Sequence, residues 1–235
     1  MTSSEFRAEA RNKLSGKWGK AALMTLAYMF FFFILGFING LFKEGSLLYL
    51  LIQIATLIIE IPLFLGLTIS FLKLYNDEEV KAFDFISMGF NNFARSWGIA
   101  WHTFLKMIVP YIIMVVLIIL MFVTLGFSFV AATSSNFESL VTSLGAFAII
   151  FFIAFIAISI WLTCLGLYYS IAYIVAADNP EISSKEAVEK SKELMTGNRS
   201  QLFILQLSFI GWAILATFTF GIGYLWLIPY IQFAT

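Results

Sequence analysis

Charged side chains are scarce in this chain. Asp, Glu, Lys and Arg make up 12% of its 235 residues, whereas apolar residues make up 61% and Phe alone occurs 27 times. Soluble domains carry about twice that charged fraction, and a soluble fold of this length does not hide so much apolar surface from water. The formal net charge of zero argues against a nucleic-acid partner. We therefore expect an integral membrane protein, whose solvent is lipid.

Residues with reactive side chains are equally few. The chain has one cysteine, Cys164, and one histidine, His102. A single cysteine forms no internal disulfide, and Cys164 lies in an apolar run, where a small buried hydrophobe is the expected role. Zinc-binding spacings, nucleophile elbows and phosphate-binding loops do not occur. The sequence therefore predicts no enzyme activity, no metal and no cofactor.

Long apolar runs occupy most of the chain. A helix needs roughly 20 apolar residues to cross a bilayer. Five runs have that length: Ala21–Phe42, Leu47–Tyr75, Gly98–Val130, Leu140–Ala177 and Leu202–Phe220. A further apolar stretch, residues 224–235, is too short to cross alone, and we expect it to belong to a sixth span after a tight turn at 220–223. The predicted fold class is all-α, a polytopic transmembrane helix bundle with five to six spans.

The distribution of Lys and Arg predicts the orientation. The first twenty residues are polar and contain no cleavable signal peptide, so the first run is expected to stay as a span. Twelve of the fourteen basic residues lie before the first span or flank the loops 76–97 and 178–200. The opposite side has only Lys43, and Lys106 lies within a span. Because positive charge concentrates in cytoplasmic loops, the N-terminus and both long loops are predicted to be cytoplasmic.

Each predicted cytoplasmic segment resembles a short amphipathic helix that leads into a hairpin of spans. Capping boxes fit at Thr2 and Glu5 and again at Ser183 and Glu186. The expected stops are Gly16 and Gly197, and the expected apolar stripes are Phe6, Ala10, Leu14 and Trp18; Phe83, Ile86, Phe90, Phe93 and Trp97; and Val188, Ser191, Leu194 and Met195. Such stripes face either lipid or the bundle.

The hairpins also share short motifs, which predict an internal repeat. "LGLTIS" at 65–70 matches "LGLYYS" at 165–170. We infer one membrane domain, 1–235, built from three parallel repeats, 1–76, 77–178 and 179–235, about an axis near the membrane normal. The small residues Gly66 and Gly166 are expected to let helices approach closely.

Three segments carry a resemblance to a known family. They are "FRAEARNKLSGKWGKA" at 6–21, "AVEKSKELMTGNRSQLFILQLSFIGW" at 187–212 and "TFGIGYLWLIPY" at 219–230. With these segments the chain resembles the domain-of-unknown-function 975 family of bacterial multi-pass membrane proteins. The resemblance implies a polytopic fold in the bacterial cytoplasmic membrane and no established activity. Family members usually run on past the "PY" at 229–230, which favours a sixth span that continues beyond residue 235.

One acid interrupts the second span near its middle. A charge at the centre of a bilayer costs roughly 2.5–3.5 kcal/mol on insertion scales, so Glu60 is expected to be protonated, paired or in contact with water. Lys106 is the candidate cation, and His102 lies one turn earlier in the same span. Pro62 and Pro110 each free a backbone carbonyl in the turn before them, and such kinks often lie beside cavities.

Two interpretations of this group stay open. Glu60, Lys106 and His102 form a proton- or ligand-binding site in a cavity, or Glu60 is a structural acid and Lys106 snorkels to the interface. The first makes the protein a carrier or a lipid- or small-molecule-handling protein. The alternative is a non-transporting membrane partner, an immunity, stress or assembly factor, that acts through its amphipathic helices. The expected partners are the lipid bilayer and, within it, a lipid, a small apolar molecule or a membrane protein. The sequence does not indicate the oligomeric state.

A further set of residues is predicted to shape the spans and turns rather than to bind a ligand. These residues are Pro62, Gly66, Pro110, Gly166, Gly197, Gly221, Gly223 and Pro229.

Overall fold

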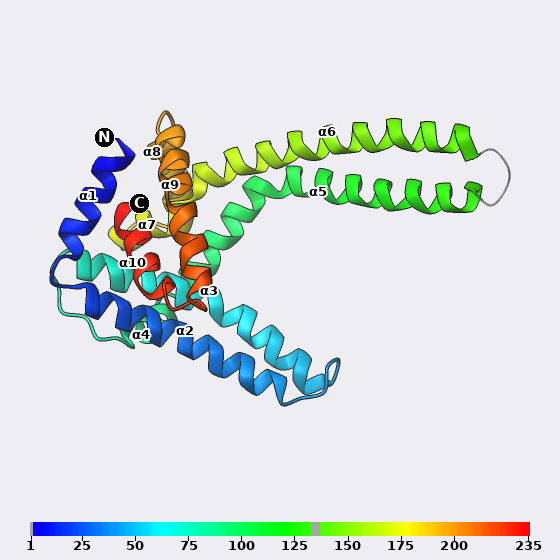
Figure 1. The fold of residues 1–235 in the computed structure, drawn as a ribbon. Helices are drawn as coiled ribbons and strands as arrows, with labels where there is room; N and C mark the ends of the chain where they lie inside the picture. Colours follow the sequence, from blue (N-terminus) through cyan, green and yellow to red (C-terminus); the bar gives the residue numbers. More distant parts are fainter. Residues whose placement is uncertain (1, 133–136) are drawn as a thin grey trace. The chain divides into compact units, whose positions relative to one another are not determined.

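The described part of the chain is all helical. The computed structural model describes residues 2–132 and 137–235, except for the side chains of residues 125–146. The helices are α1 (Ser3–Leu14), α2 (Trp18–Gly40), α3 (Leu47–Tyr75), α4 (Asp84–Asn91), α5 (Phe93–Ala132), α6 (Phe137–Tyr169), α7 (Ala172–Asp178), α8 (Ser184–Met195), α9 (Arg199–Phe218) and α10 (Tyr224–Ala234) (Figure 1). No strand occurs among the described residues, which confirms the all-α class.

The chain forms two compact units, and each is described here by itself. The first unit comprises residues 1–102 and 168–235, and the second comprises residues 103–167. The second unit is formed by parts of α5 and α6, which lie side by side (Figure 1). These unit boundaries differ from those of the predicted repeats, so the threefold repeat stays a prediction.

Five helices are long and apolar enough to cross a membrane. The candidate spans are Trp18–Gly40, Leu47–Tyr75, Phe93–Thr124, Phe147–Asp178 and Arg199–Phe218. They overlap the five predicted runs, and the second has the predicted bounds. The helix α10 has 11 residues, fewer than a bilayer needs, so the sixth span stays a prediction.

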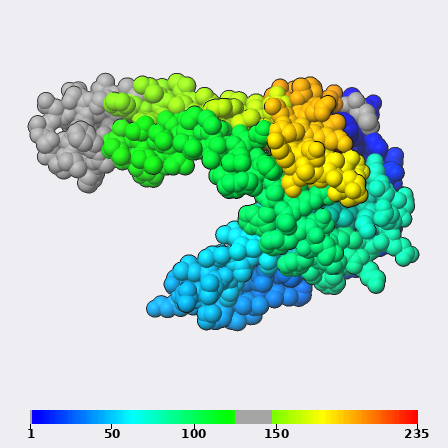
Figure 2. Space-filling view, turned by 180° about the vertical axis from the view of Figure 1, so that it is seen from behind, coloured from blue at the N-terminus to red at the C-terminus, as the bar shows by residue number. Residues whose placement is uncertain are grey.

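The fourth candidate span, Phe147–Asp178, overlaps the predicted Leu140–Ala177 and contains a break. The helix α6 ends at Tyr169, and the separate α7 begins at Ala172. At this break the Ser191 hydroxyl of α8 donates a hydrogen bond to the Tyr168 carbonyl at 2.9 Å. The bond satisfies a carbonyl that the interrupted helix leaves without an internal partner. Figure 2 shows α7 in yellow and α8 in orange side by side.

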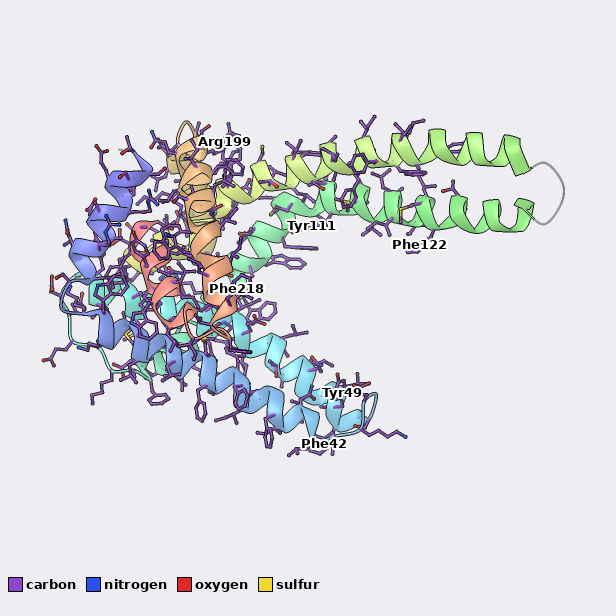
Figure 3. The ribbon with its side chains drawn as sticks, viewed as in Figure 1. Phe42, Tyr49, Tyr111, Phe122, Arg199 and Phe218 are labelled. Carbon is purple, nitrogen blue, oxygen red and sulfur yellow. The ribbon has the colours of Figure 1, made fainter. Side chains whose placement is uncertain are left out.

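The helix α3 packs through its second half and exposes its first half. Its buried residues begin at Pro62 and continue to Leu74, whereas apolar side chains before that point, such as Leu47 and Leu57, are exposed. Phe42 and Tyr49 mark the closed end of the α2–α3 hairpin (Figure 3). An uncovered apolar surface of this kind suits lipid.

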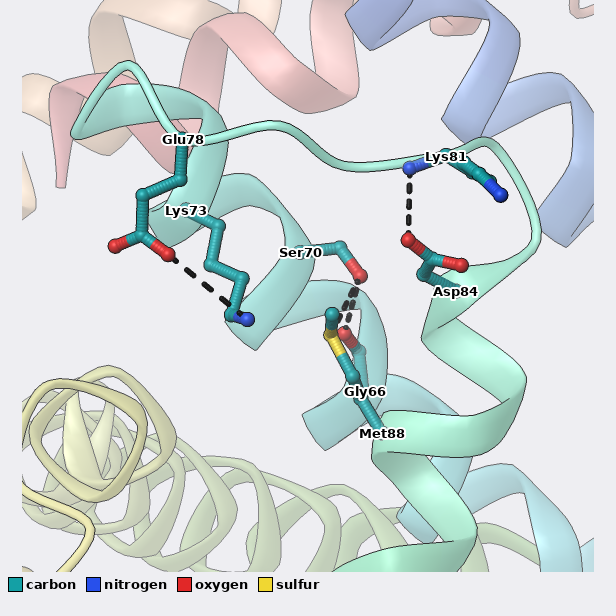
Figure 4. A network of polar contacts seen from close by, with 7 residues as sticks. All are labelled: Gly66, Ser70, Lys73, Glu78, Lys81, Asp84 and Met88. Atoms are coloured by element: carbon teal, nitrogen blue, oxygen red, sulfur yellow. Dashed lines mark hydrogen bonds and ion pairs between the residues drawn. The ribbon is translucent and has the colours of Figure 1, made fainter.

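The helix α4 crosses α3 at two glycines. A Cβ atom on Gly66 would collide with the Phe85 carbonyl oxygen and would lie 2.6 Å from the Gly89 nitrogen. A Cβ atom on Gly89 would lie 2.6 Å from the Pro62 carbonyl oxygen. Beside this crossing, the Ser70 hydroxyl contacts the Gly66 carbonyl and the Met88 sulfur (Figure 4). Backbone therefore meets backbone, as small residues permit in membrane helices.

One expectation about close helix approach is wrong. A Cβ atom on Gly166 would meet nothing within 4 Å, so the second "LGL" motif does not make such a crossing. The buried residues of α4 are Phe85 and Gly89, and the predicted aromatic stripe was expected to face either lipid or the bundle. Phe83 and Phe90 of that stripe are 61% and 47% exposed, because the glycine face is the one that admits close backbone approach.

The predicted ends of α1 and α8 are confirmed. Both helices have capping boxes, Thr2 with Glu5 and Ser183 with Glu186. Gly16 and Gly197 follow them with φ angles of 76° and 90°, a conformation that glycine adopts without steric cost. Leu14 of α1 and the α8 residues Ala187 and Val188 are fully buried, whereas Leu194 of the expected α8 stripe is 46% exposed.

Polar contacts join the segments that were predicted to share one side of the membrane. Lys17 lies between α1 and α2, and its ammonium contacts the Asp77 carboxylate at 2.6 Å and the Leu74 carbonyl at 2.8 Å. Arg95 of α5 donates hydrogen bonds to the carbonyls of Asn179 and Ile182 at 2.6 and 3.1 Å. These contacts join the residues before α2 to the 76–83 loop, and the start of α5 to the 178–184 loop.

We predict that alanine at the two "LGL" glycines has opposite effects. Gly66→Ala should lower the free energy of unfolding by about 1–3 kcal/mol, because a methyl group has no room at the α3–α4 crossing. Gly166→Ala should be neutral or stabilising by up to about 1 kcal/mol, because alanine favours helix over glycine. Thermal unfolding of both variants in detergent measures the difference. Equal melting temperatures for the two variants would contradict the crossing.

We predict that the Asp77 ion pair stabilises the protein only above acidic pH. The hydrogen bond and the charge of Lys17 lower the pKa of Asp77 from its ordinary value of about 3.9. Its contribution is therefore fully present above that value and is lost as pH falls through the lower folded-state pKa. Asp77→Asn preserves the left-handed backbone at this position (φ 65°), because Asn tolerates it.

The melting-temperature difference between the wild type and Asp77→Asn measures this effect. It should stay constant between about pH 7 and 5 and shrink below about pH 4. A difference that grows on acidification would refute the assignment.

Candidate functional site

Glu60 lies in α3 at the level where α5 begins. Its side chain is exposed, and Tyr28 of α2 lies within Coulombic range of its carboxyl group. Two residues earlier, the Ile58 carbonyl accepts a hydrogen bond of 3.1 Å from the Trp97 indole. Trp97 is the fifth residue of α5. The contact therefore places Glu60, which is near the middle of α3, beside the start of α5 rather than beside the middle of α5.

The Trp97 bond has a clear origin in the sequence. Pro62 lies inside α3 and has no N–H group, so the carbonyl of Ile58, four residues earlier, loses its helical partner. In an apolar surrounding an unpaired carbonyl costs several kcal/mol. The Trp97 indole supplies the missing donor, and the structure thus shows what becomes of the carbonyl that Pro62 frees.

The other two predicted site residues lie on α5. His102 is half-buried and belongs to the first unit, as the last residue of its 1–102 segment. Lys106 is exposed and belongs to the second unit. Because each unit is described by itself, pairing of Glu60 with Lys106 stays a prediction. Pro110 lies inside α5 and is buried.

A different set of residues lines an open cleft in the first unit. The cleft has a volume of about 470 Å³, within the range typical of ligand sites, and lies between α1, α2, α9 and α10. We call it the tryptophan cleft. Its lining includes Arg11, Trp18, Trp212, Ala216, Trp226 and Tyr230.

The turn between α9 and α10 closes one end of this cleft. Phe220 and Gly221 have positive φ angles, and the Thr219 hydroxyl accepts a hydrogen bond of 2.8 Å from the Gly223 N–H. A Cβ atom on Gly223 would lie 2.7 Å from the Ala216 Cα. Figure 3 marks Arg199 and Phe218 at the two ends of α9. The tight turn predicted at 220–223 is confirmed.

Tyr230 forms the other end of the cleft by joining α10 to α1. Its hydroxyl donates to the Arg7 carbonyl at 3.3 Å and accepts from Arg11 Nη1 at 3.0 Å. Its ring meets Trp18 edge-on at a centroid distance of 6.0 Å and Phe209 at 5.1 Å. One guanidinium is thereby held at the mouth of a cleft whose remaining lining is mostly apolar.

The cleft is suited to binding rather than to bond chemistry. Its lining combines apolar and aromatic surface with one permanent positive charge and a few hydroxyl groups. Among the described residues, no group of three His, Cys, Asp or Glu side chains is placed to hold a metal ion. The arrangement therefore points to an amphipathic ligand with an apolar body and an anionic or hydrogen-bonding end.

A second cleft, of about 240 Å³, lies between α1, α3, α7 and α10. Its polar side chains are those of Glu9, Thr68, Tyr75, Gln232 and Thr235. The Tyr75 hydroxyl donates to the Glu9 carboxylate at 3.3 Å, and the Lys13 ammonium lies 4.7 Å from the centre of the Tyr75 ring. Glu60 lines neither of these two clefts.

The sequence interpretation missed the residues of the tryptophan cleft as a group. Arg11 counted only as one of the positive charges, and Trp212 and Trp226 only as positions of the family pattern. Arg11 and Tyr230 are 219 positions apart in the sequence, and no local pattern signals that contact. The clue was the cluster of aromatic residues in the C-terminal stretch "YLWLIPY".

These features define an all-helical chain in which five described helices are able to span a membrane. A family model described as "Protein of unknown function (DUF975)" matches residues 1–235, so the chain belongs to this family. The match confirms the resemblance that the terminal segments suggested. No curated protein and no solved structure matches the chain.

We predict that Trp97 and Pro62 are energetically coupled. Trp97→Phe should lower the free energy of unfolding by about 1–3 kcal/mol, because the Ile58 carbonyl loses its donor. In a Pro62→Ala background the same change should cost about 1 kcal/mol less, because the introduced alanine restores a helical N–H for that carbonyl. Unfolding of the four proteins in mixed micelles measures the coupling.

The control for this cycle is Trp101→Phe, which changes an exposed tryptophan one turn further along α5. Its effect should be the same whether Pro62 is present or replaced by alanine. A Trp97 effect that is equally indifferent to residue 62 would show that the hydrogen bond does not depend on the proline.

Proposed function

We propose that this chain is a multi-pass membrane protein that binds lipids or small apolar molecules through the tryptophan cleft. The observation that carries the proposal is the cleft itself, in which three tryptophans surround about 470 Å³ and Arg11 stands at one end. Trp212 and Trp226 leave about half of their own surface uncovered by protein. A carrier or a lipid-handling protein needs such a binding site.

The proposed location is the bacterial cytoplasmic membrane, with the N-terminus in the cytoplasm. The family resemblance and the excess of Lys and Arg in the N-terminal segment and the two long loops support it. The contacts of Lys17 with Asp77 and of Arg95 with Asn179 support a common side for these segments.

We further infer internal repeats of an interfacial helix followed by spans. The helices α1 and α8 support this because each has 12 residues and a capping box. Each is also followed by a short turn with a left-handed glycine. The helix α4 has 8 residues and lacks these features, so the middle copy is the least regular.

The alternative function is that of a non-transporting membrane partner acting through its amphipathic helices. The observations favour lipid handling, because α1 buries Ala10 and Leu14 and α8 buries Ala187 and Val188 inside the first unit. The segment of α4 exposes the large aromatic side chains of Phe83 and Phe90, and these suit the lipid interface as well as a protein. Neither function requires a nucleophile or a cofactor, and we propose a non-enzymatic role.

We predict that brominated lipid quenches the protein's tryptophan fluorescence in a saturable way. Protein in detergent is titrated with a phospholipid brominated in its acyl chains, and tryptophan fluorescence is measured. Bound lipid should give a saturable phase, because a site holds a fixed number of chains, whereas lipid dissolved in the micelle quenches in proportion to its amount. Trp212→Phe should remove part of the saturable phase.

Trp161→Phe is the matched control, because Trp161 is similarly exposed but lies on α6 in the second unit. It should leave the saturable phase unchanged. Quenching that stays proportional to lipid in all three proteins would overturn the proposed function.

A further inference from the structure

The two ends of the tryptophan cleft differ in their chemistry. The hydroxyl of Tyr230 holds Arg11 at one end, and the turn at Thr219 and Gly223 closes the other. From Gly223 to Tyr230 the helix rises about 10 Å at 1.5 Å per residue. One leaflet of the bilayer core is about 15 Å deep. The path from Arg11 along α10 is therefore shorter than one leaflet and matches part of a single acyl chain.

The charge at the mouth of the cleft has unused donors. A guanidinium has five N–H groups, and Tyr230 accepts a bond from one of its nitrogens, Nη1. Among the described residues, no carboxylate forms an ion pair with Arg11. A guanidinium recognises a phosphate through two parallel hydrogen bonds, more specifically than an ammonium does. An anionic phosphate is thus the complementary group.

The wall of the cleft leaves apolar area uncovered. Trp212 and Trp226 are 55% and 47% exposed, and indole rings with one polar atom are typical of the membrane interface. If the N-terminal segment is cytoplasmic, Arg11 faces the leaflet that carries anionic lipids in its surface. Charge, length and location then agree on one occupant.

We propose that the tryptophan cleft binds one anionic phospholipid, with its phosphate at Arg11 and one acyl chain along α10. This assignment rests on the proposed function and adds the class of ligand to it. Tyr230 is a positioning residue, because it orients Arg11 through its hydroxyl and ties α10 to α1. Trp212 and Trp226 cover the acyl chain.

The test compares two brominated lipids that differ only in the headgroup, phosphatidylglycerol and phosphatidylcholine, by saturable tryptophan quenching in detergent. The wild type should bind the anionic lipid about tenfold more tightly, the ratio expected for a charge-assisted hydrogen bond. Arg11→Gln should abolish this preference. Lys20→Gln removes an equal charge from an exposed site outside the cleft and should retain it.

The possible outcomes distinguish the headgroup assignment from the proposed function on which it rests. Saturable binding of both lipids with equal affinity, or a preference that survives in Arg11→Gln, overturns the headgroup assignment and leaves the proposed function intact. Absence of saturable binding overturns both. Inorganic phosphate at the lipid's concentration should not compete, because it lacks an acyl chain, and displacement by phosphate would show a free-anion site instead.

A fluorescence-independent readout guards against a change in tryptophan environment. Native mass spectrometry of the same proteins with the same two lipids counts bound lipids directly. One retained phosphatidylglycerol in the wild type and in Lys20→Gln, with loss in Arg11→Gln, supports the assignment. Equal retention in all three proteins contradicts it.

Discussion

The first unit is joined by side chains that donate hydrogen bonds to backbone carbonyls of other elements. Trp97 donates to Ile58, Lys17 to Leu74, Arg95 to Asn179, Ser191 to Tyr168 and Tyr230 to Arg7. The Ile58 carbonyl lies one turn before Pro62 and the Tyr168 carbonyl lies at the end of α6, where the helix provides no internal donor, whereas the other three carbonyls lie near the end of α3, in a loop and inside α1. A protein in lipid has no water to fill that need. The same bonds therefore satisfy the backbone and fix which elements meet.

The glycine crossing of α3 and α4 depends on this arrangement. Pro62 both frees the Ile58 carbonyl and presents its own carbonyl to Gly89. The kink, the Trp97 bond and the close approach at Gly66 are thus parts of one local structure. It lies beside Glu60 and explains why a proline is tolerated there. Glu60 is exposed beside the first turns of α5.

The sequence was sufficient where the chemistry is local. The bounds of Leu47–Tyr75, both capping boxes and the turn at 220–223 were predicted because hydropathy, cap residues and glycine act within a few positions. Three features could not be predicted from the sequence. The break between Tyr169 and Ala172 depends on Ser191, the buried face of α4 depends on Gly66, and the tryptophan cleft depends on Tyr230 meeting α1, 223 positions away from Arg7. Each is decided by a distant partner, for which a single sequence has no signal.

The tryptophan cleft is therefore a better candidate site than Glu60. A lone acid in an apolar run is conspicuous in a sequence, whereas an arginine among other basic residues and tryptophans among other aromatics are not. The cleft unites apolar volume, a positioned charge and an orientation along α10. That combination is what an amphipathic ligand requires, and Glu60 by itself offers only a charge.

A high-resolution structure of the protein in nanodiscs that contain phosphatidylglycerol tests the central claim most directly. The account predicts an acyl chain in the tryptophan cleft along α10 and a phosphate within hydrogen-bond distance of Arg11. A cleft closed by protein side chains, or a lipid whose headgroup lies at the Thr219 end, would contradict it.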